Sequence, residues 1–341
     1  MECVLRMNHL STPITYIYGT LSVLAALFAT FGNITVLIIL WKPGYRSRSN
    51  TILTSLAISD TLVGAVLFPI FSIQLLYTNL LQNCAYDYMR EYITTVTIGS
   101  SLMTLGVVSY DRYILMTKVG KHKRIMSPRR VGILIALSWI FPAVSPALRF
   151  LGKGPFLYCV IVITLGPLII LLFTYYRIMK CIQKSSARIG AHGRSISDTP
   201  DISENLRASR SRNEKKNIRL ARSVSVLILA YCVCLVPSSI WSVNDLLNDS
   251  FGYTRPQVIQ NLYVFACFAG SMNSCCNPII YFFKQPGIRK GVYKLFNVKH
   301  AGFDSSSSRG LKGAGPKSSL DCSLSNDDVI SPDSSNNNPN N

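Results

Sequence analysis

Charged residues are scarce in this sequence, and acidic residues are outnumbered by basic ones. Charged side chains make up 15% of the chain, with 35 Lys and Arg against 16 Asp and Glu, whereas soluble domains carry roughly 25%. The four His lie outside the long apolar segments, at positions 9, 122, 192 and 300. An enzyme acting within a membrane would need metal ligands or a catalytic dyad at bilayer depth, so we expect no enzymatic activity.

Long apolar segments, by contrast, are abundant. Each is long enough to cross about 30 Å of hydrocarbon, which takes roughly 20 residues in a helix. Their odd number and the lack of an internal repeat fit poorly with the duplicated bundles of secondary transporters. The predicted fold is an all-α membrane protein, a seven-transmembrane helix bundle. The segments cover residues 14–41, 51–77, 88–116, 131–148, 156–180, 218–245 and 257–283.

Basic residues between these segments predict the orientation. Lys and Arg are dense after the first and third segments and from Arg177 to Arg222, and sparse in the other loops. The positive-inside rule then places residues 1–13 outside the plasma membrane and the C-terminus in the cytoplasm. This topology explains the net charge of +19, which alone is also typical of nucleic-acid binding. Because Met1–Pro13 lacks the pattern of a cleaved signal peptide, we expect the first segment to direct targeting.

Three further regions belong to or follow the seven-helix domain, which we predict over residues 14–298. Residues 182–214 are rich in Ser, Arg and Gly without an apolar period, which predicts a flexible cytoplasmic loop. Residues 287–296 alternate basic and apolar side chains at helical spacing, which predicts a short amphipathic eighth helix on the inner leaflet. The Ser- and Asn-rich composition of residues 299–341 predicts a disordered cytoplasmic tail.

One carboxylate, Asp60, lies in the middle of the apolar second segment. At this depth it needs a partner or a cation. A small cation, ordered waters, and direct hydrogen bonds without an ion all remain open. Polar residues of the third and seventh segments are available to complete such a site: Ser100, Ser101, Ser271, Asn273, Ser274 and Asn277.

The third segment ends in Asp111-Arg112-Tyr113, after an uncharged run from Ile93 to Tyr110. Charged groups at the end of an apolar helix are costly unless they lie at the membrane–water boundary. Arg112 is therefore either a switch element that faces the bundle interior or a side chain that snorkels to the interface.

Prolines lie inside the fifth, sixth and seventh predicted segments. Each removes a backbone hydrogen bond and weakens the helix locally, although single prolines in membrane helices often only kink them. Since buried polar groups lie beside two of them, Pro167, Pro237 and Pro278 predict a bundle that bends at these hinges.

Taken together, these motifs resemble a rhodopsin-like (class A) G-protein-coupled receptor over roughly residues 14–298. Each motif is weak alone, but their order along the successive segments makes a strong signal. The matching residues are Gly32-Asn33, Leu56-Ala57 with Asp60, Asp111-Arg112-Tyr113, Trp139, Pro167 with Tyr175, Pro237, and Asn277-Pro278 with Tyr281.

The resemblance implies roles for several of these residues. Arg112 would be held by Asp111 at rest and would meet the G protein on activation. Tyr175 and Tyr281 would approach each other through water in the active state. The sixth helix would swing outward at its cytoplasmic end, hinged near Pro237.

Other implied roles concern the core and the partners. Asn33 would bridge the first, second and seventh helices, and Trp139 is a further interhelical position. Asp60, Ser101, Asn273 and Asn277 match the family's sodium-pocket positions, which makes Na⁺ the one expected allosteric ion; we expect no other metal or cofactor. The partners would be a heterotrimeric G protein, an extracellular ligand and membrane lipids, with arrestin and receptor kinases acting through the Ser-rich tail. No nucleic-acid partner is expected.

Two departures from the family pattern affect signalling. Leu235 stands where the family usually has a Trp, two residues before Pro237. The start of the sixth segment reads Lys215-Lys216-Asn217, where the family often has an acidic residue that pairs with the third-helix Arg. We therefore expect a weak resting lock and appreciable basal activity.

The family's usual disulfide has candidate partners in Cys84 and Cys159. Cys84 lies about a turn further out than usual, and the loop before Cys159 is short. Cys159 therefore lies either in that loop, bridged to Cys84, or within the fifth helix. Asn248-Asp249-Ser250 is a glycosylation sequon, in a loop so close to the membrane that such sites are often unmodified.

The ligand is constrained mainly by exclusion. An amine receptor would need a carboxylate eighteen residues before Arg112, where this chain has Thr94, and an opsin would need a Lys where it has Ser271. Arg90 and Glu91 lie at the outer mouth and would meet a charged ligand or each other. A small molecule, a lipid or a short peptide remains open.

A competing hypothesis is an ion-coupled transporter or channel that uses Asp60. It predicts a continuous polar lining across several helices, whereas the polar residues cluster around Asp60 and the cytoplasmic ends. A decoy receptor that binds ligand without signalling fits less well with an intact Asp111-Arg112-Tyr113.

Overall fold

The computed structural model describes residues 12–77, 84–192, 231, 233–241, 243–244 and 257–297. The elements within these ranges are all helical. Residues 233–241, here called the sixth-segment helix, are also helical. The bounds are α1 (Thr12–Leu40), η1 (Pro43–Tyr45), α2 (Arg48–Leu62), η2 (Val63–Leu67), α3 (Phe68–Leu76), α4 (Cys84–Thr117), η3 (Val119–Lys121), α5 (His122–Ile125), α6 (Pro128–Val144), η4 (Ser145–Leu151), α7 (Lys153–His192), α9 (Gln257–Lys284) and α10 (Pro286–Leu295).

Five helical stretches in the described part of the chain are long and apolar enough to cross a membrane. They correspond to the first five predicted segments. Helix α9 coincides with the seventh predicted segment and is 28 residues long. It is more polar than these five stretches and is therefore not counted among them. The five stretches are Pro13–Leu40, Arg48–Leu76, Ala85–Thr117, Pro128–Leu151 and Gly154–Cys181.

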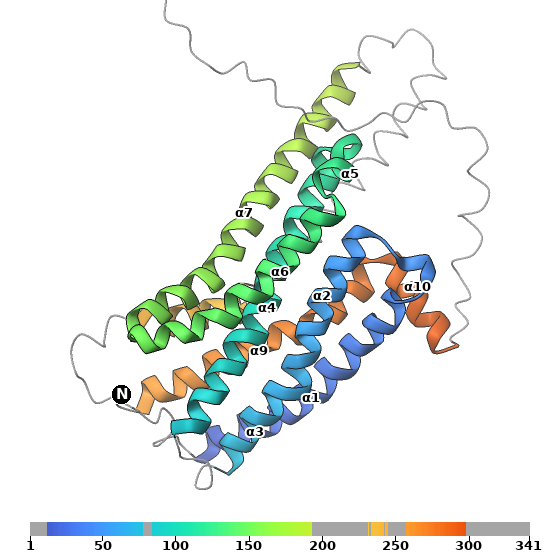
Figure 1. The fold of residues 1–341 in the computed structure, drawn as a ribbon. Coiled ribbons are helices and arrows are strands. Elements are labelled where there is room, and N and C mark those ends of the chain that lie inside the picture. The colour runs from blue at the N-terminus through green and yellow to red at the C-terminus, as the bar shows by residue number, and fades with distance from the viewer. Residues whose placement is uncertain are drawn as a thin grey trace, which may run out of the picture.

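Helix α4 occupies the middle of the bundle. It packs against α2, α6 and α7, while α1 packs against α2, α3 and α9. Figure 1 shows α10 and α5 at one end of the bundle, and the start of α1 near the opposite end. The outward faces are apolar, with Leu24, Phe31 and Phe173 more than half exposed. A surface of this kind suits contact with lipid tails rather than water.

Small residues allow the helices to approach closely. A Cβ added to Gly99 would lie 2.8 Å from the Pro142 Cβ atom, and one added to Gly64 would lie 2.6 Å from the Thr30 backbone nitrogen. Side chains at these two positions would therefore push α4 away from α6, and η2 away from α1. Small residues at crossing points are a general means of packing membrane helices.

The prolines lie where bends were expected. Pro167 is inside α7 and Pro278 is inside α9, and Pro237 lies in the sixth-segment helix. Pro142, inside α6, is a fourth that our prediction did not include. The second spanning helix also loosens into a π-helical turn over Val63–Leu67.

The predicted eighth helix is confirmed as α10, which follows α9 after Gln285. Its buried residues Ile288 and Gly291 face the bundle, while Lys290 and Lys294 are exposed. Helix α7 is longer than expected, because residues 182–192 of the predicted loop continue it to His192. The rest of that loop lies outside the described residues, as do the N-terminal segment 1–11, the sequon at Asn248 and the tail 299–341.

Candidate functional site

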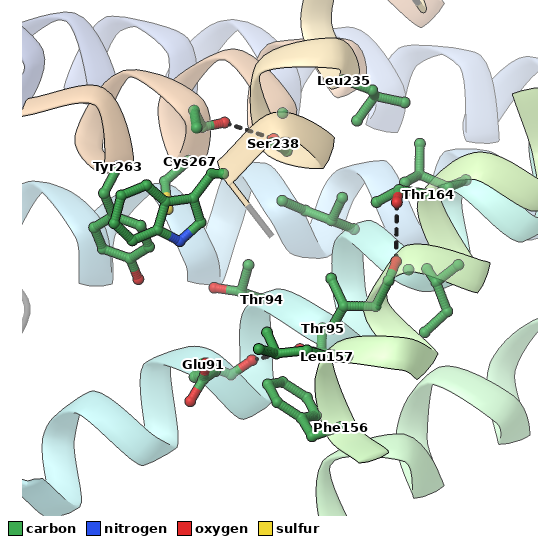
Figure 2. A pocket seen from close by; sticks show the side chains of 18 of the residues that line it. Glu91, Thr94, Thr95, Phe156, Leu157, Thr164, Leu235, Ser238, Tyr263 and Cys267 are labelled. Carbon is green, nitrogen blue, oxygen red and sulfur yellow. Dashed lines mark hydrogen bonds between the residues drawn. The ribbon is translucent and has the colours of Figure 1, made fainter. Parts of the chain in front are cut away.

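A pocket opens between α4, α7, α9 and the sixth-segment helix. The pocket has an empty volume of about 820 Å³, which includes its mouth open to solvent. In Figure 2, Thr94 and Thr95 of α4, Phe156 of α7 and Tyr263 of α9 lie around the same space. Arg90 and Glu91, which the sequence places at the outer mouth, and Thr94, the third predicted ligand-pocket residue, all line this pocket.

Arg90 is the most deeply buried charge in the pocket lining, with a relative exposure of 2%. One Nη atom donates a hydrogen bond to the Tyr263 hydroxyl at 2.5 Å, and the guanidinium carbon lies 5.5 Å from the Tyr263 ring centroid. The nearest carboxylate oxygen in the described residues belongs to Asp87 at 3.8 Å, which is beyond hydrogen-bond distance. Asp87 Oδ1 instead accepts a hydrogen bond from Gln74 at 2.6 Å.

Glu91, the pocket's own carboxylate, is paired with Arg149. The Arg149 guanidinium stacks over the rings of Tyr88 and Phe156, at 4.7 and 5.8 Å from their centroids. This arrangement holds Arg149 and Glu91 together at the pocket wall. The sequence left open whether Glu91 pairs with Arg90; in the described residues its ion pair is with Arg149 instead.

The threonines of α4 bond to their own helix. Thr94 donates to the Arg90 carbonyl at 2.7 Å and Thr95 to the Glu91 carbonyl at 2.8 Å. Deeper in the pocket, Leu235 is buried, so an aliphatic side chain lies where an indole was expected from the resemblance. Thr94 thus presents neither a charge nor a free donor to a ligand.

A second polar site surrounds Asp60, which is fully buried. Its carboxylate accepts hydrogen bonds from Ser101 at 2.6 Å, Ser274 at 2.7 Å and Asn277 at 2.6 Å. Asp60, Ser101 and Asn277, three of the four residues predicted for the sodium pocket, are therefore in contact. Asn273, the fourth, is buried nearby without a bond to Asp60, and its Nδ2 has no acceptor in the described residues.

The donor set around Asp60 suits a small hard cation. Carboxylate and hydroxyl oxygens are the ligands that such cations prefer, and the three bonded partners are neutral. The carboxylate charge therefore has no balancing cation among the residues described around it. Asp60, Ser101 and Ser274 fit Na⁺ on these grounds.

Asn33 and Trp139, the two predicted interhelical residues, each link two helices, although the described hydrogen bonds of Asn33 do not include the implied contact with the second helix. Asn33 Nδ2 donates to the carbonyls of Ala29 at 2.8 Å and Ser274 at 3.1 Å, which ties α1 to α9. Trp139 Nε1 donates to Ser55 Oγ at 2.9 Å, which ties α6 to α2. Both links use buried polar atoms and so fix the relative positions of their helices.

At the other end of α4, Asp111 does not hold Arg112. The buried Asp111 carboxylate lies 2.9 Å from the His122 Nε2 atom, and the described residues show no ion pair between Asp111 and Arg112. Arg112 is half-buried and makes no salt bridge within the described ranges. It lies within electrostatic range of Tyr281, whose buried hydroxyl lacks a partner among these residues.

The comparison with known proteins decides the family. The sequence matches the 7 transmembrane receptor (rhodopsin family) over residues 32–156 and 151–281. The chain belongs to this receptor family. It is thus a multi-pass membrane receptor with a seven-helix bundle, and not an enzyme.

Similar proteins include several trace amine-associated receptors. Receptor 6 of Pan troglodytes is 28% identical over 303 residues, which cover 78% of this chain and 81% of the relative. Receptor 8c of Rattus norvegicus is 26% identical over 299 residues, covering 80% and 84%. Receptor 9 of Mus musculus is 24% identical over 331 residues, covering 89% and 91%.

The structure describes Cys159 without the disulfide that the resemblance implies. Cys159 is a free, half-buried thiol. The physical reason is the short connection: only Gly152 separates η4 from α7, so Cys159 lies in the second turn of α7 rather than in a loop that could reach Cys84.

Proposed function

We propose that this receptor transmits the binding of an extracellular ligand to heterotrimeric G proteins, by outward movement of the cytoplasmic end of its sixth helix. The observation that carries the proposal is the continuous arrangement along α4: a pocket at Arg90, the Asp60 network at Ser101, and the Asp111-Arg112-Tyr113 motif at the opposite end. Two-state bundles of this kind let a ligand at one end bias a surface at the other. The N-terminus would lie outside the plasma membrane and the C-terminus in the cytoplasm.

The proposed ligand is neither an amine nor retinal. The relatives carry trace amines in their names, but a buried cation needs a counter-charge, and this chain has Thr94 at the position where a carboxylate would stand. The nearby carboxylates of Asp87 and Glu91 already have partners. Ser271, in the position of a retinal lysine, donates to the Cys267 carbonyl.

Two accessory roles complete the proposal. Asp60 and its hydroxyl partners would hold Na⁺, which would stabilise the resting bundle. The serines of the tail would serve receptor kinases and arrestin once phosphorylated, since phosphate adds charge that basic partners recognise. A transporter or channel that uses Asp60 has less support, because three short hydrogen bonds enclose the carboxylate.

The test is basal G-protein activation in cells, measured for each G-protein class. Wild type is compared with Arg112→Ala at matched surface expression, and with Lys118→Ala as a control for charge loss at an exposed position of the same end. We expect a wild-type signal that Arg112→Ala abolishes and Lys118→Ala keeps. A signal that survives in Arg112→Ala would refute the proposed coupling.

A further inference from the structure

We infer that Arg90 binds the carboxylate group of the ligand, and that the ligand is a small monocarboxylate with an apolar body. The inference rests on the proposed function, since it takes the pocket as the receptor's ligand site. It adds the chemical class of ligand, on which the wider signalling proposal does not depend.

The first argument is the incomplete coordination of the Arg90 guanidinium. A guanidinium carries five N–H donors, and a buried charge is costly unless it is paired and hydrogen-bonded. In the described residues Arg90 makes one short bond, to the neutral Tyr263 hydroxyl, and its Nε–H has no acceptor. Arg90 thus lines the cavity with unused donors, and the carboxylate nearest to it among the described residues, Asp87 at 3.8 Å, is beyond hydrogen-bond distance.

The second argument is that neither neighbouring carboxylate can close this gap. Asp87 lies 3.8 Å from Arg90 and is already the acceptor for Gln74. Glu91 is held by Arg149 on the other side of the wall. An external carboxylate would supply two acceptor oxygens in the planar, bidentate geometry that a guanidinium prefers.

The third argument is the rest of the pocket. Below Arg90 the lining is mainly apolar, with Phe156, Leu157, Leu235 and Trp241 around the cavity. Among the described lining residues only Arg90 and Glu91 are charged, and Glu91 is paired with Arg149. The space therefore favours an anion whose body is aromatic or aliphatic, and disfavours an amine, which Arg90 would repel.

The experiment is a binding assay on the purified full-length receptor, without G protein. Thermal unfolding is followed with phenylacetate, indole-3-acetate and hexanoate, and with the matching amides and amines. A ligand that binds only the folded state raises the unfolding temperature in proportion to its affinity. We expect at least one acid to raise it, and its amide and amine to leave it unchanged. An amine that stabilises the receptor as strongly as its acid, or no shift with any acid, would overturn the assignment.

Two variants localise the binding. Arg90→Gln removes the charge and should weaken the acid by about 30-fold or more, the size expected when one partner of a buried charged pair is lost. Tyr263→Phe keeps the ring against Arg90 but removes the competing acceptor, so acid binding should be retained or strengthened. Unchanged acid affinity in Arg90→Gln would contradict the proposal. If that variant does not fold, loss of acid binding in Tyr263→Phe would contradict it instead.

The result of this binding experiment can be distinguished from the result of the G-protein activation test. Acid binding without any G-protein activation would refute the coupling but leave Arg90 assigned. Basal activation that depends on Arg112, with no acid bound, would refute the role of Arg90 and leave the coupling intact.

Discussion

The network around Asp60 and the pocket around Arg90 each contain a buried charge, but the two charges are satisfied differently. Asp60 receives three hydrogen bonds of 2.6 to 2.7 Å from two other helices. Arg90 makes one such bond and keeps an Nε–H without an acceptor in the described residues. The network is thus nearly complete within the chain, whereas the pocket needs a molecule from outside.

The same two regions differ in how far they follow the receptor family. Asp60, Asn277 and Arg112 match the family pattern, while in the pocket Leu235 departs from it and Thr94 departs from the pattern of amine receptors. Where one fold serves many ligands, we expect the core that transmits the signal to be shared and the ligand site to differ from receptor to receptor.

The largest effect should come from removing the centre of the network. Asp60→Ala leaves Ser101, Ser274 and Asn277 without their common acceptor, and we expect the free energy of unfolding to fall by about 3 kcal/mol. Ser271→Ala is the matched control, because Ser271 bonds only to its own helix at Cys267. Thermal unfolding in detergent measures both. Equal effects of the two variants would show that the network is not a structural unit.

Removing one interhelical link should cost less and leave the pocket untouched. Trp139→Phe loses the hydrogen bond to Ser55, which is worth about 1 kcal/mol. Trp41→Phe is the control, since Trp41 is 70% exposed. We expect a lower unfolding temperature for Trp139→Phe alone, with the acid affinity unchanged. A weaker acid affinity would show that the pocket and core are not independent.

Changing the pocket wall should alter acid binding by a small factor. Glu91→Gln releases Arg149 and makes the wall more positive, so acid affinity should rise by about three-fold, a modest value because the pair is partly exposed to screening solvent. Arg149→Gln should lower the affinity for the opposite reason. The acid dissociation constants of the two variants check the sign. A change in the same direction for both would contradict this electrostatic explanation.

The smallest effect concerns the contact between Asp111 and His122. A double-mutant cycle with Asp111→Asn and His122→Phe should give a coupling in unfolding free energy of about 0.5 kcal/mol, typical of residues in contact. The pair Asp111 and Lys118 serves as a control, because Lys118 is exposed. Zero coupling for the His122 pair would remove this contact from the resting structure.

Most of the fold was predictable because membrane segments need only length and apolar composition. The site was predictable where a motif names the residue, as for Asp60, Asn277 and Trp139. The exact hydrogen-bond partners of these residues were less predictable. Ser274 rather than Asn273 bonds to Asp60, and adjacent residues on a helix point about 100° apart, so a small rotation of α9 decides between them.

Contacts that depend on loop conformation could not be read from the sequence. His122 belongs to no motif, and it meets Asp111 only because η3 and α5 fold back after α4. The sequence left open whether Cys159 is bridged to Cys84, because the bounds of α7 decide whether Cys159 lies in a loop. The charge pattern at Arg90 and Glu91 was noticed, but their separate partners, Tyr263 and Arg149, lie far away in sequence.

The central claim is that the Arg90 pocket and the Arg112 surface are coupled through the Asp60 network. Its most direct test is the affinity of the acid with the largest thermal shift, measured on purified receptor with and without a heterotrimeric G protein. Because coupling between two sites is reciprocal, we expect the G protein to raise this affinity by about 5-fold or more, and Arg112→Ala to abolish the rise. Equal affinities with and without G protein in the wild type would contradict the claim.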